Sequence, residues 1–121
     1  MANPSTTGPS GIGSEVLRRS FAIALNDNVH TLSAVGTDMI VTVLSIIVTN
    51  NTSSSGKNLE IYIKGDGGTN AHITRMVSSF GAYDTFVWND RFVLTETDQL
   101  QIASTSTDFD TWVTYIEQEF A

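Results

Sequence analysis

The run MIVTVLSIIVTN, from Met39 to Asn50, has β-branched side chains at most positions and is apolar at both odd and even positions. β-branched residues fit a pleated sheet, and a strand that is buried on both faces has a nearly continuous apolar sequence. The run therefore predicts a strand that is either central in a sandwich or pressed against another subunit. It is too short to cross a bilayer, which takes about 20 apolar residues in a helix.

Short segments of alternating side chains, separated by polar turns, fill most of the remaining chain. In LEIYIK the apolar residues Leu59, Ile61 and Ile63 are expected to face the core, and Leu100 and Ile102 repeat this pattern in QLQIAS. About eight such segments at even spacing predict an all-β fold, either a sandwich or a barrel.

Two segments leave alternatives open. SEVLRRSFAIAL, residues 14–25, is expected to be a strand, with a short amphipathic helix in an α+β fold as the alternative. TFVWN and RFVL flank Asn89-Asp90 and predict either two strands or one bulged strand. We assign Trp88 and Trp112 to the core, because aromatic residues at alternating strand positions are more often core or interface residues.

The chain has 121 residues, which suits a single domain with one core. Residues 1–13 hold both prolines and many small polar residues without an apolar period. They predict an extended N-terminal arm before a sandwich domain of residues 14–121, with a flexible tail without a role as the alternative. The arm lacks the basic and apolar regions of a signal peptide, so we expect a soluble protein made in the cytoplasm, without membrane contact.

The net charge is −7, which opposes nucleic acid as a partner because binding to phosphates depends on Lys and Arg. From Asp90 onward Arg91 is the one basic residue among many carboxylates, whereas Arg18 and Arg19 lie near the N-terminus. The basic end of one chain would suit the acidic end of a neighbour; alternatively, these charges are simply solvated.

The stretch YIKGDGGTNAHIT, Tyr62 to Thr74, combines a lysine, an aspartate, three glycines and a histidine. A phosphate-binding loop needs a helix after its glycines, whereas AHITRMVSSF has the composition of another strand. Lys64 also precedes the glycines, and Asp66 would repel a phosphate. We interpret the stretch as a hairpin loop whose glycines allow positive φ angles.

No other pattern predicts catalysis. The chain has no cysteine, only the two histidines His30 and His72, and no GxSxG motif. A calcium site at DFD, residues 108–110, is weaker than a turn with solvated charges. We therefore predict no catalytic residue, no metal and no cofactor. A small hydrolase would need a histidine beside a carboxylate, and a glycan-binding module would need exposed coplanar aromatic rings.

Three stretches carry a family resemblance, which covers approximately Val41 to the end of the chain. LEIYIKGDGGTN is a strand with a Gly/Thr loop, FVLTETDQLQIAST is a strand, an acidic turn and a second strand, and WVTYIEQEF is a closing strand. Together they resemble small all-β virion proteins of tailed bacteriophages, especially capsid decoration (cement) proteins and neck or tail modules. Thr97 stands where the common form of the acidic turn has a glycine.

The resemblance implies an antiparallel, jelly-roll-like sandwich that is not an enzyme. It implies a location on the capsid or tail surface of a virion and binding to the major capsid protein or other virion proteins. It also implies a homo-oligomer, with a trimer as the first expectation, and the alternative of a glycan- or receptor-binding neck, tail or fibre module. The expected partner-binding residues are Pro4, Pro9, Ile12, Arg18 and Arg19.

Overall fold

The computed structural model describes residues 15–22, 29–33, 38–65, 70–95, 97–104 and 109–119. The proposed arm, residues 1–13, lies outside the described residues. Every regular element in the described part is a strand. The strands are β1 (Glu15–Ala22), β2 (Val29–Ser33), β3 (Met39–Asn50), β4 (Lys57–Lys64), β5 (Asn70–Phe80), β6 (Thr85–Trp88), β7 (Phe92–Thr95), β8 (Gln99–Ser104) and β9 (Phe109–Glu119).

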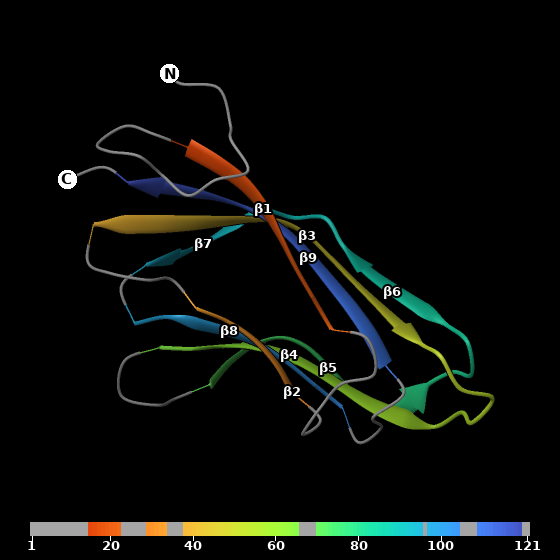
Figure 1. The fold of residues 1–121 in the computed structure, drawn as a ribbon. Coiled ribbons are helices and arrows are strands. Elements are labelled where there is room, and N and C mark those ends of the chain that lie inside the picture. Colours follow the sequence, from red (N-terminus) through yellow and green to blue (C-terminus); the bar gives the residue numbers. More distant parts are fainter. Residues whose placement is uncertain are drawn as a thin grey trace.

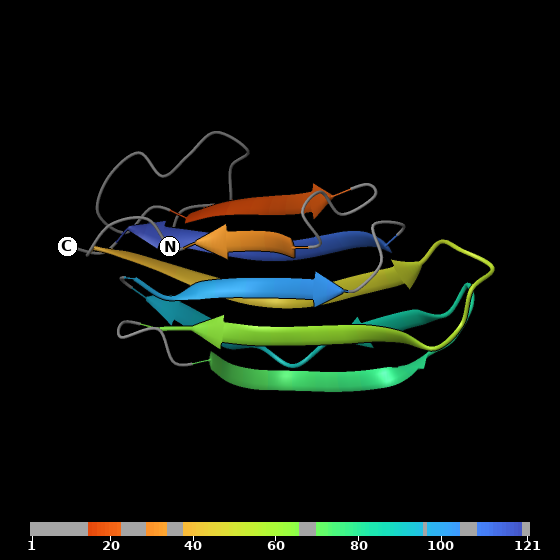
Figure 2. The same cartoon turned by 90° about the horizontal axis from the view of Figure 1, so that it is seen from below.

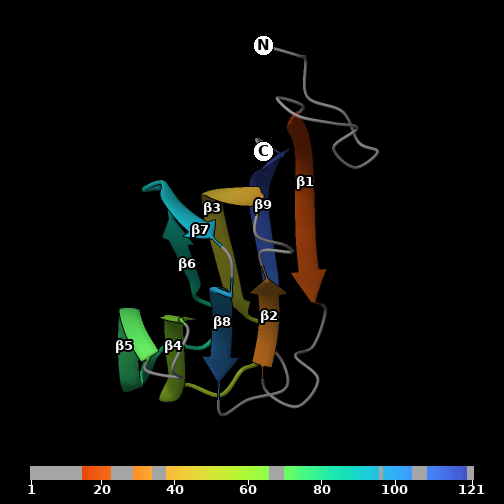
Figure 3. The same ribbon diagram turned by 90° about the vertical axis from the view of Figure 1, so that its left-hand side faces the viewer.

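The strands form two antiparallel sheets that face each other as layers (Figure 1). Sheet A has the order β1-β9-β3, and β6 and β7 both pair with the free side of β3. Sheet B has the order β2-β8-β4-β5 and lies nearer the viewer in Figure 2. Figure 3 shows that β1 and β2 lie at one edge of the sandwich and β5 and β6 at the other.

This strand order is that of a jelly roll. When β6 and β7 are counted as one interrupted strand, the two sheets have four strands each, in the orders 1-8-3-6 and 2-7-4-5. These are the two interlocked Greek keys of the jelly-roll architecture. The all-β, jelly-roll-like sandwich expected from the sequence is therefore confirmed.

The segment-level predictions agree with most of these strands. Residues 15–22 form a strand, so the helical alternative for this segment is wrong. Asn89-Asp90 separate two short strands rather than bulging one. The segments on either side of the glycine-rich stretch form the β4–β5 hairpin, with Lys64 opposite Asn70, while residues 66–69 of the loop lie outside the described part.

The core lies between the sheets and takes side chains from both. It is made of the buried residues Leu32, Val41, Val43, Ile46, Val48, Leu59, Ile61, Phe80, Leu94, Leu100, Ile102, Phe109, Val113 and Tyr115. Trp88 packs against this cluster, as predicted. Trp112 does not: it points away from the core and is 37% exposed, so its assignment to the core is wrong.

The central strand β3 has apolar side chains at both odd and even positions, and the structure shows two reasons for this. A register shift against β9 between Val43 and Ser45 inserts one extra residue, so the buried positions change from odd (Val43) to even (Ile46). Such a β-bulge moves every later side chain to the opposite face. In addition, Ile47 faces outward and is 38% exposed.

Within the described residues there is no helix that is long and apolar enough to span a membrane.

Candidate interaction surface

The side of sheet A that faces away from the core, which we call the outer face, carries rows of apolar side chains across several strands. One row consists of directly opposed residues of β1, β9, β3 and β6: Phe21, Trp112, Ile47 and Val87. A second row, four residues away along β1 and β9, consists of Leu17, Ile116, Thr42 and Val93, of which Thr42 alone is polar. Arg19 and Thr114 oppose each other between the two rows.

The apolar residues of the outer face are unusually exposed for a sheet surface. Of the nine large hydrophobic residues that are exposed in the described part, six belong to these rows: Leu17, Phe21, Ile47, Val87, Val93 and Trp112. Single exposed hydrophobic residues are normal on any protein, but a contiguous group marks a surface that binds something. The outer face is therefore the candidate functional site.

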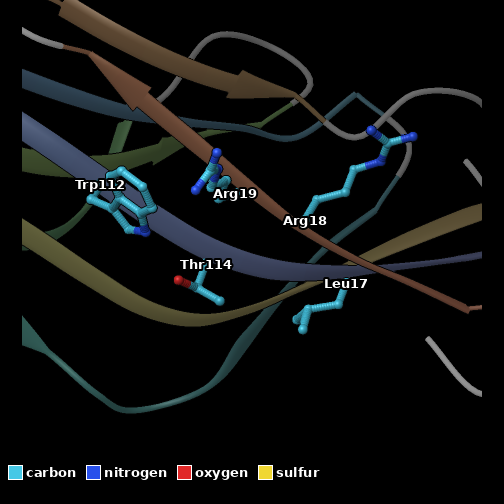
Figure 4. A pocket seen from close by; sticks show the side chains of 5 residues that line it. All are labelled: Leu17, Arg18, Arg19, Trp112 and Thr114. Carbon is cyan, nitrogen blue, oxygen red and sulfur yellow. The ribbon is translucent and has the colours of Figure 1, made fainter. Parts of the chain in front are cut away.

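Phe21, Trp112 and Arg19 form the centre of one half of this face. The rings of Phe21 and Trp112 are stacked, with centroids 5.3 Å apart and planes inclined by 20°. The guanidinium carbon of Arg19 lies 5.1 Å from the centroid of Trp112 and 5.9 Å from that of Phe21, within the range of a cation–π contact. Figure 4 shows Arg19 beside Trp112, with Leu17 and Thr114 on the neighbouring positions of β1 and β9.

Two shallow hollows lie around this group. A hollow of about 500 Å³ is lined by Leu17, Arg18, Arg19, Trp112 and Thr114. A smaller one, of about 190 Å³, lies on the other side of Trp112, against Phe21, Ile47 and Asp110. Trp112 thus stands between two depressions, so this part of the outer face is not flat.

The outer face carries little charge. Among the described strand residues its charged side chains are Arg19, which is positive, and Glu15 and Asp110, which are negative. The net charge of the face is therefore −1. The whole chain carries −7. The amide of Gln118 donates a hydrogen bond of 2.8 Å to the Glu15 carboxylate, which ties this charge to the face.

The two arginines predicted to bind a partner point to opposite sides of sheet A. Arg19 is on the outer face. Arg18 faces the other way, and its Nε lies 3.0 Å from a carboxylate oxygen of Glu117 in an ion pair on the neighbouring strand. Burial and the Glu117 carboxylate raise the pKa of the nearby Tyr115 hydroxyl, and Arg18 partly opposes this shift. Pro4, Pro9 and Ile12 lie outside the described residues.

His30 is buried between the sheets. Its Nε2 lies 2.7 Å from Ser20 Oγ on β1, and its Nδ1 lies 2.6 Å from Thr111 Oγ1 on β9. Burial lowers the pKa of the imidazole, because desolvation disfavours its charged form. Both hydrogen-bond partners are hydroxyl groups, so the carboxylate that the hydrolase hypothesis places beside a histidine is not among these contacts.

The other candidate residues are scattered over the fold. Phe109 and Tyr115 are buried, Tyr83 is exposed in the turn before β6, and His72 lies beside Tyr62 on the β4–β5 hairpin. Asp110 lies on β9, and Asp108 is outside the described residues. Throughout the described ranges, no group of three or more histidine and acidic side chains is close enough to hold a metal ion.

Fold and surface together define a jelly-roll sandwich with an exposed apolar sheet face. Comparison with known protein families, curated proteins and solved structures finds no match for this chain.

Sequence reasoning missed the outer face as a site, although a signal was present. The apolar residues at both odd and even positions of Met39–Asn50 had suggested contact with another subunit as one of two alternatives. Leu17 and Phe21 also lie two residues before and two residues after Arg19, on the same side of a strand. The rows become visible only when β1, β9, β3 and β6 are placed side by side.

Proposed function

We propose that this chain is a non-enzymatic structural protein of a virus particle that assembles through protein–protein contacts. The observation that carries the proposal is the outer face of sheet A, where aromatic, aliphatic and arginine side chains are exposed together. The centres of protein interfaces have this composition, with Trp, Phe and Arg enriched and acidic residues depleted. A sheet face of this kind is suited to burial against another protein.

The jelly-roll fold is compatible with the same function but is weak evidence for it, because one fold serves many functions. This architecture recurs in viral capsid proteins, lectins and cupins, so it favours a structural or binding role without deciding between them. Among the virion proteins that the sequence resembles, a capsid decoration protein on the major capsid protein is the first candidate. In this proposal the sandwich supplies one contact, and residues 1–13, with Pro4, Pro9 and Ile12, anchor the protein as an arm.

The exposed Phe21 and Trp112 also bear on the alternative of a glycan-binding neck, tail or fibre module. A sugar stacks on the open face of an aromatic ring. Here the two rings are stacked on each other, and Arg19 lies close to both. Because part of each ring is already covered, the geometry favours a protein partner over a glycan.

The proposal expects a major capsid protein gene near the gene for this chain, and the product of that gene is the test partner. Full-length protein is mixed with particles assembled from that capsid protein, and the bound amount is measured by co-sedimentation. We expect saturable binding, and a variant that lacks residues 1–13 should remain folded but bind less. If full-length protein does not sediment with the particles and instead binds a glycan array, the structural role is wrong. If the truncated variant binds at full occupancy, the anchoring role of the arm is wrong.

A further inference from the structure

We infer that the outer face of sheet A binds the same face of a second copy of this chain, about a two-fold axis that runs along the strands between β9 and β3. The inference names the partner of the surface on which the proposed function rests. Two properties of the face point to self-association rather than to a different partner, namely its charge and its division into two unlike halves. The size of the face then sets the strength of the contact.

Charge selects this face for contact between copies. Two chains that each carry −7 repel one another, and the repulsion is smallest where the facing surfaces carry the least charge. The outer face has a net charge of −1, from Arg19, Glu15 and Asp110. It offers neither a basic nor an acidic partner a complementary field, and it therefore fits a partner that is equally neutral and apolar at the contact.

The face is complementary to itself. In the first row the bulky rings of Phe21 and Trp112 occupy β1 and β9, and the smaller Ile47 and Val87 occupy β3 and β6. A two-fold axis between β9 and β3 places the aromatic half of one copy on the aliphatic half of the other. Phe21 then faces Val87 and Trp112 faces Ile47 of the second copy. An isologous contact requires this kind of self-complementary surface.

The second row and Arg19 agree with the same axis. Leu17 on β1 faces Val93 of the second copy, since β7 takes the edge position beside β3 in that row. Arg19 on β1 then faces the connection between β6 and β7. An axis perpendicular to the strands would instead place the Arg19 side chains of the two copies against each other, and like charges in direct opposition are unfavourable.

The size of the face sets the strength of the contact. The face is four strands wide, with neighbouring strands about 4.8 Å apart, and eight residues long, with a rise of about 3.3 Å per residue. Its area is therefore roughly 500 Å². Two such faces bury about 1,000 Å² in total, which is near the lower limit for a specific interface. The pair should therefore form reversibly and depend on protein concentration.

Analytical ultracentrifugation of the full-length chain from about 1 µM to 1 mM tests the pairing, a range in which a weak dimer dissociates on dilution. We expect a monomer–dimer equilibrium.

Val87→Asp should weaken the dimer about tenfold or more, because the contact would desolvate the new carboxylate. Val77→Asp is the matched control: Val77 is 62% exposed and lies on edge strand β5 of sheet B. It adds the same charge and should leave the equilibrium within about twofold of the wild type, as expected for a site outside the contact.

The axis is tested by cross-linking, for which the absence of cysteine is an advantage. Facing sheets lie about 10 Å apart, too far for a direct disulfide, so a short bismaleimide is used. A mixture of Phe21→Cys and Val87→Cys chains should give cross-linked dimers, whereas Phe21→Cys with Val77→Cys should not. Efficient cross-linking of Phe21→Cys with Leu17→Cys instead would show the perpendicular axis and overturn the proposed one.

The outcomes separate this inference from the proposed function. A chain that dimerises through the outer face but does not bind capsid particles supports the inference and contradicts the capsid role. A chain that stays monomeric at the highest concentration, or forms a trimer that Val87→Asp leaves intact, overturns the inference. If such a chain binds particles through the same face, the structural role stands with a different partner.

Discussion

His30 links the two sheets through a single side chain. It belongs to β2 of sheet B, and its hydrogen-bond partners Ser20 and Thr111 belong to β1 and β9 of sheet A. A neutral imidazole donates one hydrogen bond and accepts the other, and a hydroxyl can take either role. The site is therefore satisfied in the neutral form without a charge at the sheet interface.

The lowered pKa of His30 makes the stability of the protein dependent on pH. Because burial lowers the pKa in the folded state, the unfolded chain binds the proton more tightly. We therefore expect the free energy of unfolding to be highest above about pH 6.5 and to decrease as the pH falls below that value. Urea unfolding at several pH values between 5 and 8 measures this slope.

The contribution of His30 is isolated by the variant His30→Gln, which lacks a titratable group at this position. The difference between the variant and the wild type should change with pH in this range. A wild-type slope that His30→Gln fully retains would assign the pH dependence to other titratable groups.

Asn50 is a second buried polar residue that joins distant segments. Its side-chain amide donates hydrogen bonds of 3.1 Å to the Ser54 carbonyl and 2.8 Å to the Gly81 carbonyl. Its backbone N–H donates to the carbonyl of Asp84 at 2.9 Å. Through these bonds Asn50 fixes the turn after β3 to the turn before β6.

Replacement of the Asn50 amide by a carboxylate should be strongly destabilising. Asn50→Asp removes the donor and places a buried negative charge against two carbonyl oxygens, at a cost of about 3 kcal/mol or more. The neighbouring Asn51→Asp adds the same charge at an exposed position and should change stability by less than about 0.5 kcal/mol. Thermal and urea unfolding compare the two variants. Equal losses of stability would show that the hydrogen bonds of Asn50 do not contribute.

At the scale of the element, β3 places a core residue and an outer-face residue at adjacent positions. Ile46 is fully buried in the core, whereas the next residue, Ile47, lies on the outer face. The two side chains are identical and adjacent but point to opposite sides of the sheet.

Aspartate at these two positions should therefore have different consequences. Ile46→Asp should unfold the domain, as should Ile61→Asp in sheet B, because an unpaired buried charge costs as much as a small domain's whole stability, about 5–15 kcal/mol. Ile47→Asp should remain folded and lose self-association. Circular dichroism and light scattering distinguish these states, and unchanged melting of Ile46→Asp would contradict its place in the core.

Most strands could be predicted from the sequence because alternation is a local property. Alternation shows which residues share a face but not which face is inward, and this is why the position of Trp112 was wrong. Both sets of side chains in TWVTYIEQEF are mixed, with Trp112 and Ile116 in one and Val113 and Tyr115 in the other. The larger aromatic residue favoured the wrong set, whereas the structure buries Val113 and Tyr115.

At the scale of the whole molecule, the approximate number of strands could be predicted, about eight against the nine in the described residues, but their order could not. The order depends on pairings between distant segments, such as Leu17 with Ile116 and Ile47 with Val87. These pairings create the outer face, since no single segment contains a complete row. The candidate site is thus a property of the jelly-roll topology, and local patterns reveal only its individual residues.

The position of β9 also has a consequence for how the protein is made. This strand lies between β1 and β3. Glu15 at the start of β1 pairs with Gln118 near the end of β9. During synthesis β1 and β3 leave the ribosome long before the strand that joins them. Chains grow at about 5–20 residues per second, so these two strands wait for several seconds with unpaired edges and exposed apolar side chains. We therefore expect sheet A to close late, and the nascent chain to be most prone to chaperone capture or aggregation just before β9 emerges.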